Sequence, residues 1–226
     1  MTNVIQINKD TWQIDEDFVR WFLLCGEKEA VLIDTGVIGN AREVAEKLTK
    51  LPLRVINTHA DRDHIAGNKA FETFYMHPAD FAQYYHQMPL QNAEALWDGE
   101  VIDLGRRELE IIHTPGHTCG SVAVLDRKYR FLFSGDPVQT GDIYMFGPYR
   151  SMQAYIKSIE RLLKRKEEFD LIFPCHGECP LKNDILEPLK TEAEEVLAGK
   201  HSSETLELHG SKIRRVKTGH AGFLLD

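Results

Sequence analysis

The stretch Thr58-His59-Ala60-Asp61-Arg62-Asp63-His64 places two imidazoles and two carboxylates within six residues. In an extended loop, residues at i and i+2 point the same way, so His59, Asp61 and Asp63 can converge, while His64 can reach a second ion. Such groups are costly to bring together unless a cation joins them. The stretch therefore predicts a metal site; the alternative is a polar loop whose charges face water.

Three further segments present a potential metal ligand directly after an apolar predicted strand. Taken singly, a histidine in such a loop is more often a hydrogen-bonded loop residue, and an aspartate after glycine is usually a turn former. Open α/β sheets, however, place their chemistry at the carboxyl ends of strands. Repetition at several strand ends therefore favours one shared site. The segments are Thr114-Pro115-Gly116-His117, Phe133-Ser134-Gly135-Asp136 and Phe173-Pro174-Cys175-His176.

The rest of the chain mixes predicted strands and helices. Apolar runs at 21–25 and 30–34 flank the turn 26–29, which predicts a hairpin. The run 54–58 predicts a buried parallel strand that leads into the metal-site stretch. This mixture predicts layered α and β structure. Helices are predicted over 40–50, 79–97, 151–166 and 183–197.

Composition and charge narrow the class of protein. The chain has 226 residues, 42% hydrophobic and 27% charged, and no linker divides it, so we expect a single domain over 1–226. Its net charge of −8 repels phosphate backbones, so nucleic acid is not an expected partner. The sequence contains neither an apolar stretch of roughly 20 residues nor a signal peptide. With four scattered cysteines, it is expected to be cytoplasmic, without a membrane partner.

In their order and contexts, these segments resemble the metallo-β-lactamase fold superfamily. Its usual signature is T-H-x-H-x-D-H, followed by a histidine in P-G-H-T, an aspartate in S-G-D and a late histidine. Asp34-Thr35-Gly36 is similar to the early D-T-G turn of the family. The resemblance covers most of the chain. It implies an α+β fold, a four-layer αββα sandwich with the metals at one edge of the two sheets.

The resemblance also implies two divalent metal ions as cofactors, with zinc expected and manganese or iron as alternatives. Asp61 departs from the family, which usually has a histidine there. A carboxylate hardens that position and favours ions such as Mn²⁺ or iron. The alternative is that Asp61 orients a ligand without binding metal, leaving one position weak. The implied ligands are His59, Asp61 and His117 for the first metal, Asp63, His64 and His176 for the second, and Asp136 as the bridge.

The expected activity follows from the metals. A bound divalent ion lowers the pKa of its water to about 7, so hydroxide is available at neutral pH. We therefore expect a hydrolase that uses metal-bound hydroxide on a small ester, thioester or lactone, with Asp63 as the catalytic residue that orients the nucleophile. Three alternatives stay open: a small-molecule phosphodiesterase of the same fold, a di-iron redox or oxygen-handling protein suggested by Asp61, and a metal-binding module without activity.

The expected partner is a small-molecule substrate, and one segment is a candidate wall of its pocket. Residues 137–150 follow the predicted ligand Asp136 and are rich in glycine and aromatic residues. Tyr144, Tyr149 and Arg150 are the candidate substrate contacts, because aromatic rings offer apolar surface and an arginine pairs with anions. The alternative is that the aromatic residues pack beneath the following helix.

Overall fold

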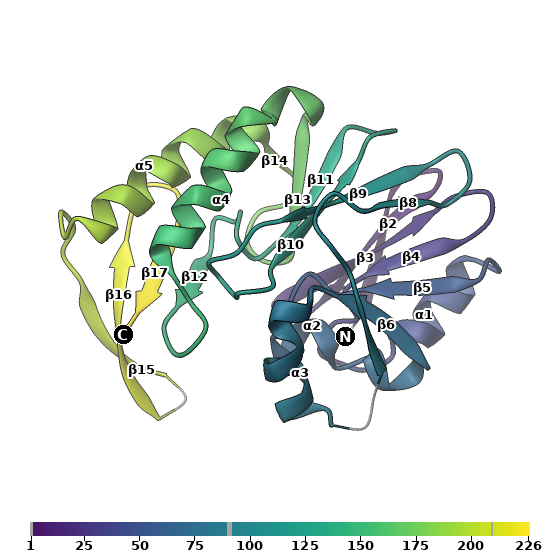
Figure 1. Cartoon of the computed structure of the whole chain (residues 1–226), viewed down its shortest axis with the longest axis horizontal. Helices are drawn as coiled ribbons and strands as arrows, with labels where there is room; N and C mark the ends of the chain where they lie inside the picture. The colour runs from purple at the N-terminus through teal and green to yellow at the C-terminus, as the bar shows by residue number, and fades with distance from the viewer. Residues whose placement is uncertain (1, 90–91, 209) are drawn as a thin grey trace.

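The computed structural model describes residues 2–89, 92–208 and 210–226, which form three sheets (Figure 1). The first sheet has its strands in chain order, antiparallel from β1 to β4 and parallel from β4 to β7. Its parallel strands therefore deliver the segments that follow them to one edge. The strands are β1 (Thr2–Asn8), β2 (Thr11–Glu16), β3 (Val19–Cys25), β4 (Ala30–Ile33), β5 (Leu53–Ile56), β6 (Thr73–Met76) and β7 (Asn92–Ala95).

The second sheet has the order β14-β13-β11-β10-β9-β8, and within it only the β11–β13 pairing is parallel. Its strands are β8 (Val101–Asp103), β9 (Glu108–His113), β10 (Val122–Asp126), β11 (Phe131–Gly135), β13 (Leu171–Pro174) and β14 (Leu181–Lys182). A smaller third sheet has the order β12-β17-β16-β15. It consists of β12 (Asp142–Met145), β15 (Glu204–Leu208), β16 (Ser211–Lys217) and β17 (Gly222–Leu225).

The two larger sheets pack face to face. Successive residues of a strand point to opposite faces, and β3 is apolar on both. Phe22 and Leu24 belong to the core between the sheets, whereas Trp21 and Leu23 belong to the core on the outer side of the first sheet. The ring of Phe22 meets Phe133 of β11 edge-on, with centroids 4.9 Å apart. Alternation along β3 thus builds two layers at once.

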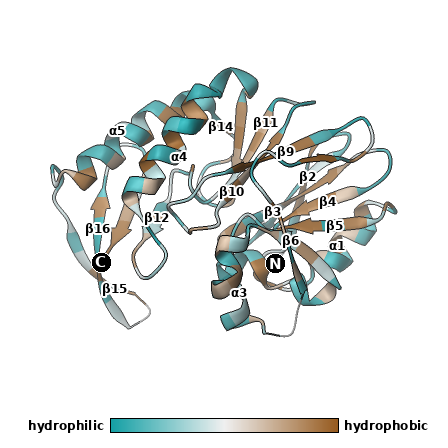
Figure 2. Cartoon of the chain, in the orientation of Figure 1, coloured by the Kyte–Doolittle hydropathy of each residue, from teal (hydrophilic) through white to brown (hydrophobic). Residues whose placement is uncertain are grey.

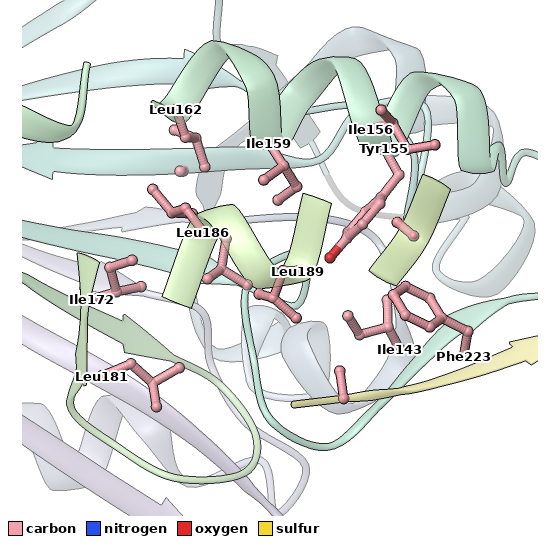
Figure 3. Packing of buried hydrophobic residues seen from close by; sticks show 14 of the residues in the cluster. Ile143, Tyr155, Ile156, Ile159, Leu162, Ile172, Leu181, Leu186, Leu189 and Phe223 are labelled. Atoms are coloured by element: carbon pink, nitrogen blue, oxygen red, sulfur yellow. The ribbon is translucent and has the colours of Figure 1, made fainter. Parts of the chain in front are cut away.

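Helices cover the outer faces of both sheets. Ala41 and Ala45 of α1 are buried in the outer core of the first sheet. Figure 3 shows the corresponding core of the second sheet, where Ile159 of α4 and Leu189 of α5 lie with Ile172 of β13. The layers run helix, sheet, sheet, helix, so the predicted αββα sandwich is confirmed. The helices are α1 (Ala41–Leu48), α2 (Arg62–Ile65), α3 (Phe81–Gln87), α4 (Met152–Lys164) and α5 (Leu186–Leu197).

The predicted helix over 79–97 is wrong in its second half. Helix α3 ends at Gln87, and 92–95 form strand β7 beside β6. The reason is Pro89, which lacks a backbone N–H and disfavours helical geometry in the residue before it. Met88 accordingly has φ −136° and ψ 70°. Residues 90–91 lie outside the described residues.

The distribution of hydropathy fits this layering. Figure 2 shows apolar residues concentrated on the central strands and hydrophilic residues along α4 and α5. Within the described part of the chain, no helix is both long and apolar enough to cross a membrane.

Candidate metal centre

The predicted metal ligands lie where strands of the two large sheets end. The stretch 58–64 leads from β5 into α2. His117 lies in the loop between β9 and β10, Asp136 follows β11 and His176 follows β13. The face-to-face packing of the sheets brings these strand ends together. Six of the seven predicted ligands fall into two adjacent groups, and the seventh, Asp136, lies between them.

His59, Asp61 and His117 form the first cluster. The His117 Nε2 atom lies 3.2 Å from both His59 Nε2 and Asp61 Oδ2, and the His59 Nε2 to Asp61 Oδ2 distance is 3.6 Å. Ligands held at zinc-like bond lengths in a tetrahedron are about 3.3 Å apart. The three atoms are therefore spaced like ligands of one ion.

Asp63, His64 and His176 form the second cluster. The Asp63 Oδ2 atom lies 3.6 Å from His64 Nε2 and 3.3 Å from His176 Nε2. Asp136 stands between the clusters. Its Oδ1 is 3.4 Å from His64 Nε2, and its Oδ2 is 3.4 Å from His176 Nε2 and 3.5 Å from His117 Nε2. The two oxygens of Asp136 thus face imidazole nitrogens of both clusters.

Hydrogen bonds on the far side of each imidazole set its tautomer. His64 Nδ1 donates to Asp34 Oδ2 at 2.8 Å, because a carboxylate only accepts. The Thr58 hydroxyl donates to the same Asp34 carboxylate at 2.7 Å, so its oxygen accepts from His59 Nδ1 at 2.9 Å. With Nδ1 protonated, the neutral rings of His59 and His64 present the Nε2 lone pair to the centre.

The other two imidazoles are held in the same tautomer by main-chain carbonyl groups. His117 Nδ1 donates to the carbonyl of Tyr144 at 2.9 Å, and His176 Nδ1 donates to the carbonyl of Phe18 at 2.8 Å. Phe18 also stacks on the His176 ring, with an interplanar angle of 8°. All four histidines thus direct an Nε2 lone pair toward carboxylate oxygens.

Two of these atoms show directly that the residues fit a cation. His64 Nε2 and Asp136 Oδ1 are buried, and neither has a hydrogen-bond partner among the described residues. They face each other at 3.4 Å. A lone pair that faces a buried carboxylate is repulsive unless a proton or a metal ion lies between them. The donor set of imidazole and carboxylate groups suits a divalent ion such as zinc.

The directions of the pKa shifts also indicate that this centre favours positive charge. Burial disfavours the charged form of His64, but the carboxylates of Asp136 and Asp63 outweigh it and raise the His64 pKa well above its ordinary value. Burial likewise opposes the charge on His176, yet Asp136 and Asp63 raise its pKa to about 10. Burial would raise the pKa of Asp136, but His176 and His64 hold it well below its usual range. Protons and a metal ion would therefore compete for the same centre.

Two buried carboxylates that hold the site together were not predicted as site residues. Asp34 accepts from the backbone N–H of Thr58 at 2.7 Å, besides the two contacts described above. Asp80 accepts from the N–H of Ala60 at 3.0 Å, the Thr118 hydroxyl at 2.8 Å and the N–H of Gly120 at 2.6 Å. It thereby ties the His59 loop to the His117 loop. The D-T-G turn was a signal for Asp34, but no local pattern marks Asp80.

A further group of potential ligands, fully buried, contains Asp34, His64 and Cys175. Its geometry differs from that of the two clusters. His64 Nδ1 and the Cys175 thiol both donate to Asp34 Oδ2, at 2.8 and 3.4 Å. Burial raises the pKa of the Cys175 thiol far above its ordinary value, so the thiol stays protonated. This group is satisfied by its own hydrogen bonds.

A cavity of about 600 Å³ opens onto both clusters. Figure 1 shows α2 and α3 on one side of the region and β12 on the other. Of the predicted substrate contacts, Tyr144 and Arg150 line the cavity. Tyr149 is 55% exposed and does not line it. The Arg150 guanidinium is already engaged by Asp61.

A second hollow of about 720 Å³, lined by residues of α1, β5 and β6, contains none of the predicted ligands.

Comparison with known proteins decides the family. The sequence model of the metallo-beta-lactamase superfamily matches residues 14–176. The chain belongs to the metallo-beta-lactamase superfamily. The predicted family is therefore confirmed.

Two curated relatives and one solved structure are similar to this chain. The human acyl-coenzyme A thioesterase MBLAC2 is 28% identical over 185 residues, covering 63% of this chain and 66% of that protein. The hydroxyacylglutathione hydrolase of Aeromonas hydrophila is 31% identical over 118 residues, covering 51% and 44%. A metallo-beta-lactamase from Pontibacter korlensis has the same fold, with a TM-score of 0.73 at 18% identity over 86% of this chain and 99% of that one. The chain spans about half to two thirds of the length of the first curated relatives it matches.

Proposed function

We propose that this chain is a metal-dependent hydrolase that cleaves small thioesters, with esters and lactones as related substrates. The observation that carries the proposal is the set of four Nε2 lone pairs that converge on carboxylates at the floor of a cavity. Two relatives named as hydrolases of thioesters support the substrate class.

In this proposal the first and second clusters would each hold one divalent ion, zinc foremost, and Asp136 would contribute to both clusters. Such ions, when bound, supply a water of lowered pKa and polarise the substrate carbonyl. The clusters are adjacent, because Asp136 Oδ2 lies within 3.5 Å of an imidazole nitrogen from each. One substrate carbonyl can therefore be reached from both.

Asp63 is the proposed catalytic residue. Its side chain is 23% exposed and lines the cavity. Burial would raise its pKa, but His64 and His176 outweigh this effect and lower it. The carboxylate is therefore ionised at neutral pH. It can accept a hydrogen bond from an attacking water and so orient that water toward the substrate.

The cavity wall fits an acyl group. Phe18, Val37 and Phe146 give it apolar surface, and Tyr144 lies against Phe146 with ring centroids 5.3 Å apart. Burial, together with the charge of Asp63, raises the pKa of Tyr144. Its hydroxyl therefore stays protonated and can donate to the substrate carbonyl or to the leaving sulfur.

The test is hydrolysis of a panel of small acyl thioesters, esters, lactones and phosphodiesters by the zinc-loaded protein. We expect turnover of thioesters, and a loss of kcat by about 100-fold or more in Asp63→Asn, since general-base groups contribute on that order. The matched control is Asp142→Asn, which changes a carboxylate of the same cavity that pairs with Arg215 at 2.9 Å. Turnover confined to phosphodiesters, or full activity in Asp63→Asn, would contradict the proposal.

A further inference from the structure

Arg150 is built into the first cluster. Its Nη2 donates to both oxygens of Asp61, at 3.0 and 2.8 Å, and its Nη1 donates to the carbonyl of His117 at 2.6 Å. The side chain is only 12% exposed. The next residue, Ser151, donates its N–H to the carbonyl of Gly116 at 2.8 Å. Main chain and side chain thus both fix Arg150 on the His117 loop.

These and one further hydrogen bond occupy most of the acceptor capacity of the Asp61 carboxylate. Its Oδ1 accepts from Arg150 and from Gln83 Nε2, the latter at 2.7 Å. Its Oδ2 accepts from Arg150 and faces His117 Nε2 at 3.2 Å. A carboxylate oxygen accepts about two hydrogen bonds, so a metal ion in the first cluster has to share Oδ2 with the guanidinium.

Among the described residues, the second cluster has no such competitor. Asp63 pairs only with His64 and His176 among the residues that the structure describes, and it has no arginine or lysine partner there. Its charge remains available to a cation. In the first cluster, by contrast, the positive charge of Arg150 offsets the negative charge of Asp61, and Nη1 lies 3.0 Å from His117 Nε2, an atom that would bind the metal ion. The guanidinium and an ion bound there would repel each other.

We propose that Arg150 makes the two metal positions unequal, so that the second cluster binds a divalent ion tightly and the first cluster binds one weakly. This inference rests on the proposed function, because it assumes that both clusters bind metal. The guanidinium competes with the ion for Asp61 and keeps the Asp61 side of the cavity electrically balanced when a single ion is bound. Arg150 is in this sense a positioning residue that sets metal occupancy.

The experiment is a titration of the metal-stripped full chain with Zn²⁺ by calorimetry and with Co²⁺ by visible absorption. We expect two binding steps whose dissociation constants differ by about tenfold or more, since charge pairs at this range contribute on that order. Arg150→Met keeps the length of the side chain and removes its charge, and it should tighten the weaker step by about tenfold. The matched control is Arg62→Met, which removes another cavity arginine whose Nε donates to Gln87 at 3.2 Å. It should leave the separation of the two steps unchanged.

Two results would overturn the inference. One is equal affinity for both equivalents in the native protein. The other is a further weakening of the weaker binding step in Arg150→Met, which would mean that Arg150 holds Asp61 in place as a ligand. Should Arg150→Met fail to fold, Arg150→Lys keeps one charge with fewer contacts and should give a smaller separation than the native protein. Absence of any binding by the native chain would instead overturn the proposed function, so the two failures are distinguishable.

Discussion

Replacing Asp80 with asparagine should weaken both the fold and the first cluster. The carboxylate is 1% exposed and accepts the three hydrogen bonds that join the His59 and His117 loops. An amide has only one acceptor oxygen, so its NH₂ group must face at least one of these donors. If the oxygen stays with Ala60 and Thr118, the buried N–H of Gly120 loses its partner.

The magnitude follows from that loss. A buried donor without a partner costs about 1–3 kcal/mol, and the remaining bonds weaken because the acceptor is no longer charged. We therefore expect Asp80→Asn to lower the free energy of unfolding by about 2–4 kcal/mol. For a chain of this size, that corresponds to a fall in Tm of roughly 5–15 °C.

Thermal unfolding followed by circular dichroism measures the loss of stability, with Glu72→Gln as a control at an exposed carboxyl group. Co²⁺ titration measures the weakening of the first cluster, because His59 and His117 both belong to it. We expect the weaker binding step to become weaker still while the tighter step stays unchanged. An unchanged Tm, or a lower Tm with both binding steps intact, would refute the role assigned to Asp80.

Three further changes test other parts of the site. Gly116 has φ +140°, and a Cβ there would lie 2.4 Å from the backbone of Tyr155. Gly116→Ala should therefore lower Tm and abolish hydrolysis. A native Tm and native turnover in this variant would contradict the expectation. Arg20 donates to the carbonyl groups of Pro174 and Gly177, on either side of His176, at 3.1 and 2.6 Å. Arg20→Met should therefore weaken the tighter Zn²⁺ binding step. Unchanged Zn²⁺ affinity in calorimetry would count against this role. The folded-state pKa of His176 is raised to about 10, so its contribution to stability is complete below its ordinary value of 6.5 and disappears as pH rises toward 10. Tm of the metal-stripped protein should therefore fall over that range, whereas a Tm that rises with pH would show the sign to be wrong.

The sequence was sufficient to predict the candidate ligands because they lie in short motifs at the ends of strands. Residues 58–64 and the loop of His117 can each be recognised by their residue types and by the apolar run before them. The face-to-face packing of the two large sheets then brings these ends together. The layered architecture could be predicted from the mixture of apolar strands and helices and from the family resemblance, and β3 is apolar on both faces, as a strand between two layers is.

Contacts across long separations in sequence could not be predicted. Asp61 and Arg150 are 89 residues apart, and no local pattern links them, so Arg150 was expected to meet substrate rather than Asp61. Asp80 escaped prediction because two of its three partners are main-chain N–H groups, which leave no trace in residue type. Residues 92–95 include two alanines, which favour helix, and pairing with β6 overrides that preference.

Elemental analysis of the full chain after equilibrium dialysis against zinc measures how many metal ions the two clusters hold. We predict close to two equivalents of metal, lost on chelation, and close to one equivalent in a variant that removes the second cluster, His64→Ala with His176→Ala. Protein that retains no metal after dialysis would contradict a metal centre, because the convergent lone pairs and carboxylates would then be neutralised by protons alone.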